Sequence, residues 1–200
     1  MVVLQHPLIE HKLGILRDKN TGTKEFRELV SKIAIFLCYE AMKDVTLQER
    51  EITTPLCSTK AGRLDEEQIA FIPILRAGMG MLDGIIKVVP NAKIGHIGIY
   101  RNEKTLKPVN YFLKVPENIE KREVFLLDPM LATGGSAVDA ISLLKQKGVE
   151  KITFLSIIAA PEGIKKVENN YPEVKLYCAH IDDHLYEKGY IVPGLRRCWR

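Results

Sequence analysis

Residues 124–136 read Val-Phe-Leu-Leu-Asp-Pro-Met-Leu-Ala-Thr-Gly-Gly-Ser, and the pattern of this stretch decides the fold. The apolar start predicts a buried strand over 123–128. A single carboxylate, Asp128, stands where that strand ends. Residues 136–147 then show the apolar spacing of an amphipathic helix. The stretch therefore predicts a strand, a tight turn and a helix in direct succession.

The turn between these two elements has the composition of an anion cradle. Gly134 and Gly135 let the backbone turn its N–H groups toward one point. The helix N-terminus adds unpaired donors and a partial positive charge, so we predict a phosphate site over 132–136. Asp128 lies one turn away, where a carboxylate can hold sugar hydroxyls. A phosphate beside a sugar diol describes a ribose 5-phosphate.

Two familiar phosphate motifs are absent from this turn. It has neither the Gly-Lys-Ser/Thr of a Walker loop nor the three-glycine spacing of a dinucleotide fingerprint. The plain alternative is an ordinary strand-turn-helix whose glycines serve only tight packing.

The rest of the chain alternates strand and helix patterns. Strands are predicted over 69–75, 93–100, 151–159 and 174–181, helices over 24–45, 79–89 and 162–170, and an arm or hairpin over 109–115. This alternation indicates an α/β fold in one domain, 1–200, with a parallel sheet flanked by helices. Ligands of such sheets bind at the carboxyl ends of strands. Arg76, Arg101 and Asp128 each follow a predicted strand, so we expect them to converge.

Composition limits the class of protein. No apolar run reaches the roughly 20 residues of a membrane span, and the start of the chain lacks a signal-peptide pattern. The four cysteines are far apart, which argues against disulfides and a thiolate metal site. The net charge is +4, but Arg196, Arg197 and Arg200 supply three of these charges, so residues 1–195 carry +1. We therefore expect no membrane and no nucleic-acid partner.

The stretch 128–134, Asp-Pro-Met-Leu-Ala-Thr-Gly, resembles the 5-phosphoribosyl-1-diphosphate (PRPP) signature of the type I phosphoribosyltransferases, in the variant found in the uracil phosphoribosyltransferase family. Most type I members carry two adjacent acids here, whereas this chain has Asp128-Pro129. Further matches follow in the expected order at 6–8, 11–13, 17–22, 73–78, 95–101, 159–163 and 187–195. The resemblance thus covers nearly the whole chain.

The resemblance implies a fold and a reaction. The fold is a type I phosphoribosyltransferase-like parallel sheet flanked by helices, with a small hood formed by the chain termini. The reaction is the transfer of the 5-phosphoribosyl group of PRPP to uracil, giving UMP and diphosphate in cytoplasmic pyrimidine salvage. Mg²⁺ accompanies PRPP as cofactor. The family also leads us to expect a homo-oligomer, a dimer or tetramer with 101–115 as an arm, and activation by GTP.

The same resemblance assigns the site. Arg76, Arg101 and Asp128 are the expected catalytic residues, and guanidinium groups suit the diphosphate because they bind such anions in bidentate fashion. Each arginine taken singly is equally well a solvated strand end. Asp128 is assigned to the ribose hydroxyls before the metal, because Pro129 replaces the second acid, and no side chain is assigned as metal ligand. The expected PRPP-binding residues are Arg76, Arg101, Asp128, Pro129, Met130, Leu131, Ala132, Thr133, Gly134, Gly135 and Ser136.

Uracil binding is expected near the end of the chain. Uracil is small and planar, so the backbone of a rigid loop can read its edge, and the resemblance places Tyr190 and Ile191 against it. A simple C-terminal turn is the alternative for 190–194. Asp182-Asp183 looks like a metal pair, but we interpret it as a helix or turn cap.

The chain departs from the family after Leu195. The family continues Gly-Asp-Ala-Gly-Asp-Arg, whereas residues 196–200 read Arg-Arg-Cys-Trp-Arg. The codons GGC GAT GCT GGC GAT AGG preceded by one inserted C become CGG CGA TGC TGG CGA TAG, which encode this ending and a stop. We therefore hypothesise a single-base insertion, which preserves the PRPP site and impairs the uracil site. A natural divergent tail is the alternative.

Two other functions stay open at this point. Some proteins of this fold regulate pyrimidine genes by binding RNA, but they usually retain the double acid, which this chain lacks. The altered tail also makes a scaffold that binds PRPP or nucleotide without turnover a coherent alternative. It predicts PRPP binding without UMP formation.

Overall fold

The structure is a computed structural model that describes residues 1–101, 108–187 and 189–195. Within these residues, nine strands form the central sheet, in the order β1-β11-β10-β8-β4-β6-β7, with β5 beside β4 and β9 beside β10. All pairs are parallel except β6 and β7. The strands are β1 (Val2–Val3), β4 (Ile69–Leu75), β5 (Lys93–Ile94), β6 (His96–Arg101), β7 (Pro108–Lys114), β8 (Glu123–Leu127), β9 (Met130–Leu131), β10 (Ile152–Ala159) and β11 (Lys175–Ile181).

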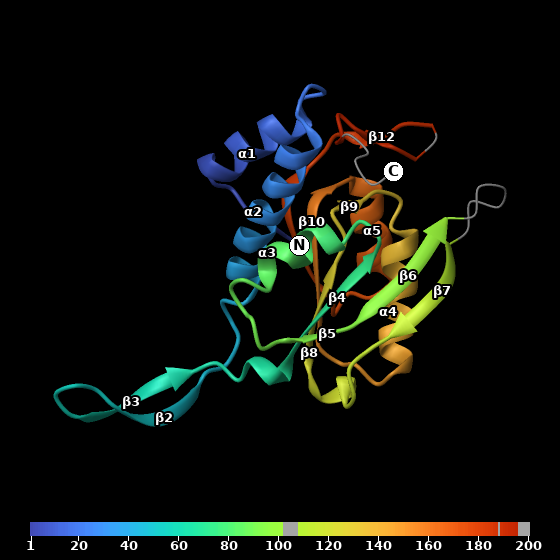
Figure 1. Ribbon diagram of the computed structural model, residues 1–200. Helices are drawn as coiled ribbons and strands as arrows, with labels where there is room; N and C mark the ends of the chain where they lie inside the picture. The colour runs from blue at the N-terminus through green and yellow to red at the C-terminus, as the bar shows by residue number, and fades with distance from the viewer. Residues whose placement is uncertain (102–107, 188, 196–200) are drawn as a thin grey trace.

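Helices cover both faces of this sheet (Figure 1). One face carries α1 (Pro7–Arg17), α2 (Thr23–Ala41) and α3 (Met79–Ile85), and the other carries α4 (Gly135–Gln146) and α5 (Pro161–Asn170). Two short 3₁₀ turns, Glu66–Gln68 and Ile119–Lys121, precede β4 and β8. The predicted α/β fold with a parallel sheet between helices is therefore confirmed.

The central strands β4 and β8 are apolar over most of their length because each one serves two cores. In β4, Ile69 and Phe71 pack into the cluster under α1, α2 and α3, whereas Ala70 and Ile72 pack into the cluster under α4 and α5. Successive side chains of a strand point to opposite faces, so a strand buried on both faces reads as a continuous apolar run. β8 follows the same rule, which is why 124–127 contains no polar residue.

The hairpin prediction for 109–115 is confirmed, because β7 pairs antiparallel with β6. The remaining part of the expected arm, 102–107, lies outside the described residues. The helix prediction for 24–45 is wrong at its end. The helix α2 ends at Ala41, and Met42 and Val45 pack against the core from a turn. Apolar spacing alone does not distinguish these two arrangements.

Several elements, among them one helix and one hairpin, have no counterpart in the sequence predictions. The helix α1 begins with Pro7, and the ring nitrogen Nδ1 of His6 accepts the N–H of Leu8. The strands β2 (Gln48–Thr53) and β3 (Ser58–Arg63) form a hairpin that projects from the body (Figure 1). Its side chains are almost all exposed, so it lacks the alternation that reveals a half-buried strand.

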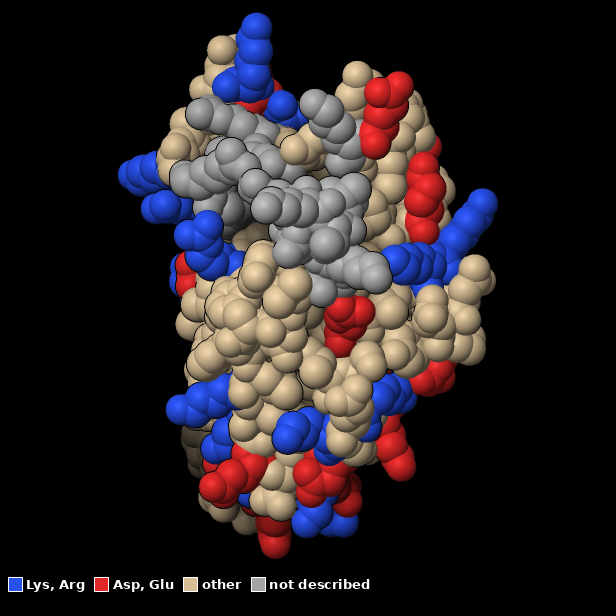
Figure 2. Space-filling view, turned by 90° about the vertical axis from the view of Figure 1, so that its right-hand side faces the viewer, with Lys and Arg blue, Asp and Glu red and all other residues tan. Residues whose placement is uncertain are grey.

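The surface carries mixed charge. On the face that Figure 2 shows, Lys and Arg side chains are interspersed with Asp and Glu, with no continuous basic stripe among the described residues. Across the described part of the chain, no helix combines the length and apolar character needed to cross a membrane.

Gly84 offers a test of how closely the helices pack. A Cβ at this position of α3 would lie 2.2 Å from the carbonyl oxygen of Ser31 in α2. We expect Gly84→Ala to lower the free energy of unfolding by about 1–3 kcal/mol, the usual cost of overpacking, in urea-induced unfolding. Gly14→Ala is the matched control, since nothing lies within 4 Å of its added Cβ in α1. An alanine at 84 that is as harmless as one at 14 would contradict this packing.

Candidate active site

The strand β8 ends at a break in the sheet, and Asp128 follows it in a half-buried position. The N–H of Asp128 donates to the carbonyl of Leu155 at 3.2 Å, and the carbonyl of Pro129 accepts the N–H groups of Ile157 and Ile158, each at 3.1 Å. Residues 128 and 129 thus remain hydrogen-bonded to β10, although the regular strand β8 has already ended. Pro129 has no N–H to donate, which suits a point where a ladder is interrupted.

The next residues form a turn with unused backbone donors. Gly134 has a φ of 73° and caps α4, and no side chain caps this helix end. The N–H of Val138 donates to the carbonyl of Gly134, so the intrahelical ladder begins there. The N–H groups of Gly135, Ser136 and Ala137 precede this first bond and have no recorded partner among the described residues. Such a helix end attracts an anion.

These donors line a hollow of about 190 Å³. The hollow brings two distant segments together, since Gly189, Tyr190 and Ile191 form part of its wall. The remaining lining residues are Asp128, Met130, Leu131, Ala132, Thr133, Gly134, Gly135, Ser136 and Ala137. The predicted phosphate turn and the predicted base loop therefore face one cavity.

A short hairpin places the second segment. The strands β12 (His184–Leu185) and β13 (Ile191–Val192) pair antiparallel, and the N–H of Tyr186 donates to the carbonyl of Tyr190 at 2.7 Å. The carboxylate of Glu162, in the first turn of α5, accepts the N–H of Leu185 at 3.1 Å. This bond ties the hairpin to the helix behind the phosphate turn.

The environment of Asp128 changes its acidity. Burial raises the pKa of its carboxyl from the ordinary 3.8 to about 7, and the N–H of Met130, which donates to this carboxyl, offsets part of the rise. Among the described lining residues of the hollow, Asp128 is the single acidic side chain. A carboxyl that titrates near neutrality inside a cavity is a frequent mark of a functional site.

Comparison with known proteins agrees with this geometry. The family model for uracil phosphoribosyltransferase matches residues 3–196. The chain belongs to the uracil phosphoribosyltransferase family. The match ends at residue 196, close to the point where the sequence departs from the family pattern after Leu195.

Individual relatives support this membership. The uracil phosphoribosyltransferase of Clostridium tetani is 57% identical over 192 residues, which cover 96% of this chain and 92% of the relative. A Clostridium botulinum relative of the same name is 56% identical over the same shares. A solved protein structure from Aquifex aeolicus has a TM-score of 0.94 at 42% identity and covers 98% of this chain and 94% of its own. Adenine phosphoribosyltransferase from Trypanosoma brucei, with a TM-score of 0.60 at 14% identity over 94% and 86% of the two chains, shares the fold.

Membership in this family places the chain among the pentosyltransferases. The two arginines expected at the site lie close to strand ends. Arg76 follows β4, and Arg101 is the last residue of β6. The strands β8, β4 and β6 are adjacent and parallel. Asp128, Arg76 and Arg101 therefore all lie at the carboxyl-terminal ends of these strands, on the same side of the sheet. The side chain of Arg76 is exposed, whereas that of Arg101 lies outside the described part. Arg76 and Pro129 are absent from the lining of the 190 Å³ hollow.

Two glycines of this family member serve packing beside the site. A Cβ at Gly78 would lie 2.4 Å from the carbonyl oxygen of Leu127, at the end of β8. A Cβ at Gly163 would lie 2.3 Å from the carbonyl oxygen of Ala132, within the phosphate turn. Both glycines lie in stretches that carry the family resemblance, 73–78 and 159–163. Their role follows from close backbone approach, which no local pattern reveals.

The pair Asp182-Asp183 also has a defined role. Asp182 is only 2% exposed and accepts hydrogen bonds from Arg17 and from the N–H of Gly194. It thus caps the turn at Gly194, as the cap interpretation anticipated. Arg17 stands in the quoted motif 17–22, yet nothing in the sequence joins it to Asp182.

A side chain added at Gly163 in α5 would displace the phosphate turn, because α5 packs directly against Ala132. We expect Gly163→Ala to push Ala132 away and to weaken ribose 5-phosphate binding by roughly tenfold or more, because small displacements at such sites are costly. Isothermal titration calorimetry with ribose 5-phosphate measures this. Gly22→Ala is the control, since its added Cβ meets nothing within 4 Å. A folded Gly163→Ala variant with unchanged affinity would refute the supporting role.

The raised pKa of Asp128 predicts that the free energy of unfolding depends on pH. The pKa of its carboxyl is about 7 in the folded chain and near its ordinary 3.8 in the unfolded chain. Between these values the folded state holds a proton that the unfolded chain has lost, so stability from this group declines as pH rises through that range. Thermal unfolding should therefore show Asp128→Asn more stable than the parent at about pH 8, with a much smaller difference near pH 4. Equal effects at both pH values would contradict the raised pKa.

Proposed function

We propose that this chain transfers the 5-phosphoribosyl group of PRPP to uracil, giving UMP and diphosphate. One observation carries the proposal: free helix-end donors and the loop 189–191 line the same hollow. A nucleoside monophosphate has a phosphate and a planar base joined by a ribose. Its site therefore needs donors for the phosphate on one side and a surface that contacts the base on the other. Family membership supplies the identity of the base.

The roles of the residues follow from their chemistry. We assign the 5-phosphate to the turn 133–136, where the N–H groups of Gly135 and Ser136 are available, and the ribose hydroxyls to Asp128, whose carboxylate form is favoured by the hydroxyl donors. Backbone groups at Tyr190 and Ile191 are assigned to the edge of uracil. Arg76 and Arg101, at the same sheet edge, are assigned to the diphosphate. The predicted PRPP-binding role of 128–136 thus stays a proposal supported by the shared cavity.

The reaction needs opposite charges at two points. The bond from the anomeric carbon to the diphosphate oxygen breaks, a bond to uracil N1 forms, and the proton of N1 passes to the departing diphosphate. Negative charge develops on the leaving diphosphate, where guanidinium groups stabilise it, and positive charge develops on the ribose ring. The carboxylate of Asp128 lies on the ribose side and stabilises that positive charge.

The metal is expected to arrive with the substrate. Mg²⁺ requires about six oxygen ligands and is commonly held by one or two carboxylates together with substrate phosphates. Among the described residues, no cluster of three or more His, Cys, Asp or Glu side chains could hold a metal ion. Asp128 can supply at most one protein ligand, so this donor set fits a Mg²⁺ held mainly by diphosphate and water. The ion would neutralise charge on the diphosphate.

The wider setting is proposed on the resemblance alone. We place the chain in cytoplasmic pyrimidine salvage as one domain that assembles into a homo-oligomer, a dimer or a tetramer, with GTP as activator. The face that Figure 2 shows carries interspersed charges among its described residues, and this face gives no support to an RNA-binding regulator.

An activity assay tests the proposal directly. UMP formation from uracil and PRPP with Mg²⁺ is measured for this chain and for one with Gly-Asp-Ala-Gly-Asp-Arg restored after Leu195. The altered tail lies outside the described residues, and the frame hypothesis predicts that restoration raises activity strongly. Sequencing of the coding DNA across these codons checks the inserted base independently.

The outcomes separate the alternatives. Activity in the restored chain alone supports the function and the frame hypothesis together. Equal activity in both chains supports the function and refutes the account of the tail. Inactivity of both chains would overturn the proposed reaction and favour a scaffold that binds nucleotide without turnover.

A further inference from the structure

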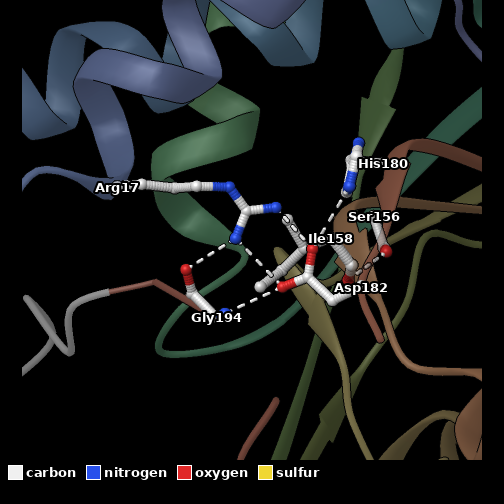
Figure 3. Close-up of polar contacts among 6 residues, drawn as sticks. All are labelled: Arg17, Ser156, Ile158, His180, Asp182 and Gly194. Carbon is white, nitrogen blue, oxygen red and sulfur yellow. Dashed lines mark hydrogen bonds and ion pairs between the residues drawn. The ribbon is translucent and has the colours of Figure 1, made fainter. Parts of the chain in front are cut away.

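A cluster of hydrogen bonds joins the end of α1 to the last described segment of the chain. Arg17, the last residue of α1, reaches across to Asp182, which follows β11, and to Gly194 (Figure 3). Its Nη1 donates to Oδ2 of Asp182 at 3.0 Å and to the carbonyl of Gly194 at 2.8 Å. Its Nη2 donates to Oδ1 of the same carboxylate. We call Arg17, Asp182 and Gly194 the hood clamp.

The carboxylate in this clamp is buried and fully engaged. The side chain of Asp182 has no exposed surface, and its Oδ2 also accepts the N–H of Gly194 at 2.8 Å. Nε2 of His180 lies 3.7 Å from Oδ1, at the exposed side. The backbone N–H of Asp182 donates to the carbonyl of Ala159 at 2.8 Å, which fixes the residue to the end of β10. Asp182 is thus an anchor held by the sheet.

Gly194 is held at both of its backbone polar groups. Its N–H donates to Asp182 and its carbonyl accepts Arg17, so the clamp determines the peptide orientation on both sides. The residue has a φ of 71°, and a Cβ here would lie 2.3 Å from the carbonyl oxygen of Ile191. Gly194 therefore packs directly against the backbone of Ile191.

Ile191 lines the hollow that faces the phosphate turn. The other links of this hairpin, the N–H of Asp183 to the carbonyl of Val192 at 3.0 Å and the N–H of Tyr186 to that of Tyr190, lie within the hairpin itself. Within the described residues, the clamp and the bond from Leu185 to Glu162 are polar contacts that join it to the rest of the molecule, and Ile191, Leu185 and Leu195 pack against the core under α1, α2 and α3. Loss of the clamp would leave the Ile191 side of the hairpin without its ionic anchor.

From this geometry we propose that Arg17 and Asp182 are positioning residues for residues 189–191, which we call the nucleobase loop. They touch no substrate and act through Gly194 on the backbone of Ile191. The inference rests on the proposed function, because it assumes that this backbone reads the base. A contact made by the backbone cannot be restored by a change of side-chain rotamer. A displacement of this loop by about 1 Å can therefore weaken binding of the base, or slow the reaction, by roughly tenfold to hundredfold.

The test compares two ligands that differ by the base. UMP and ribose 5-phosphate are titrated calorimetrically into this chain and into Arg17→Met, Asp182→Asn and the double variant Arg17→Met with Asp182→Leu. The expected result is a loss of at least about tenfold in the preference for UMP, with ribose 5-phosphate affinity nearly unchanged. General destabilisation would weaken both ligands together and leave their ratio alone.

Matched variants guard against unspecific effects. Arg27→Met makes the same change at an exposed position of α2, and Asp183→Asn does so beside Asp182. Both should keep the preference for UMP. The double variant removes both charges at once, so it avoids the uncompensated buried charge that could unfold a single variant. The whole series is repeated in the chain with the restored tail.

Each outcome bears on the proposal. A double variant that folds and keeps the parent's preference for UMP overturns the positioning role. Absence of any preference for UMP in both parent chains also overturns it, since no base site would then exist at 189–191. Failure of the parents to bind ribose 5-phosphate refutes the proposed function instead, which distinguishes the two failures.

Discussion

The loop between β8 and α4 leaves backbone N–H groups at a helix end that have no partner within the described part of the chain, and the rest of the site is arranged around them. Gly134 takes a positive φ so that the helix can begin abruptly, and Gly163 lacks a side chain so that α5 can press against Ala132. Backbone N–H groups that lack an acceptor destabilise the folded chain, and they bind an anion when one enters the hollow and accepts their hydrogen bonds. This requirement explains why small residues and close backbone contacts gather here.

A second arrangement completes the cavity from the opposite side. The nucleobase loop belongs to the last part of the described chain, and it is joined to α1 by the buried pair Arg17–Asp182. The end of α1 and the segment 182–194 are therefore connected through Arg17, Asp182 and Gly194. Buried ion pairs add little net stability, but they fix geometry because a single partner cannot be lost cheaply. The pair fits a role in setting the position of Gly194 more than one in holding the fold together.

The sequence predicted the parts that depend on local pattern. The continuous apolar runs of β4 and β8 and the glycine turn before α4 have local causes, namely burial on two faces and backbone freedom at Gly134. The hairpin β2–β3 was missed because its exposed side chains carry no periodicity. The clamp was missed because Arg17 and Asp182 are neighbours only in space, and the packing roles of Gly78 and Gly163 depend on contacts across elements. The proximity of the phosphate turn and 189–191 was expected from the family resemblance and is now visible as one cavity.

The most direct test of the account is an experimental structure of this chain with UMP bound. The account predicts the 5-phosphate within hydrogen-bonding distance of the N–H groups of Thr133 to Ser136, the ribose hydroxyls at Asp128 and the edge of the base against the backbone of Ile191. A phosphate bound elsewhere, or a base that stacks away from 189–191, would contradict it.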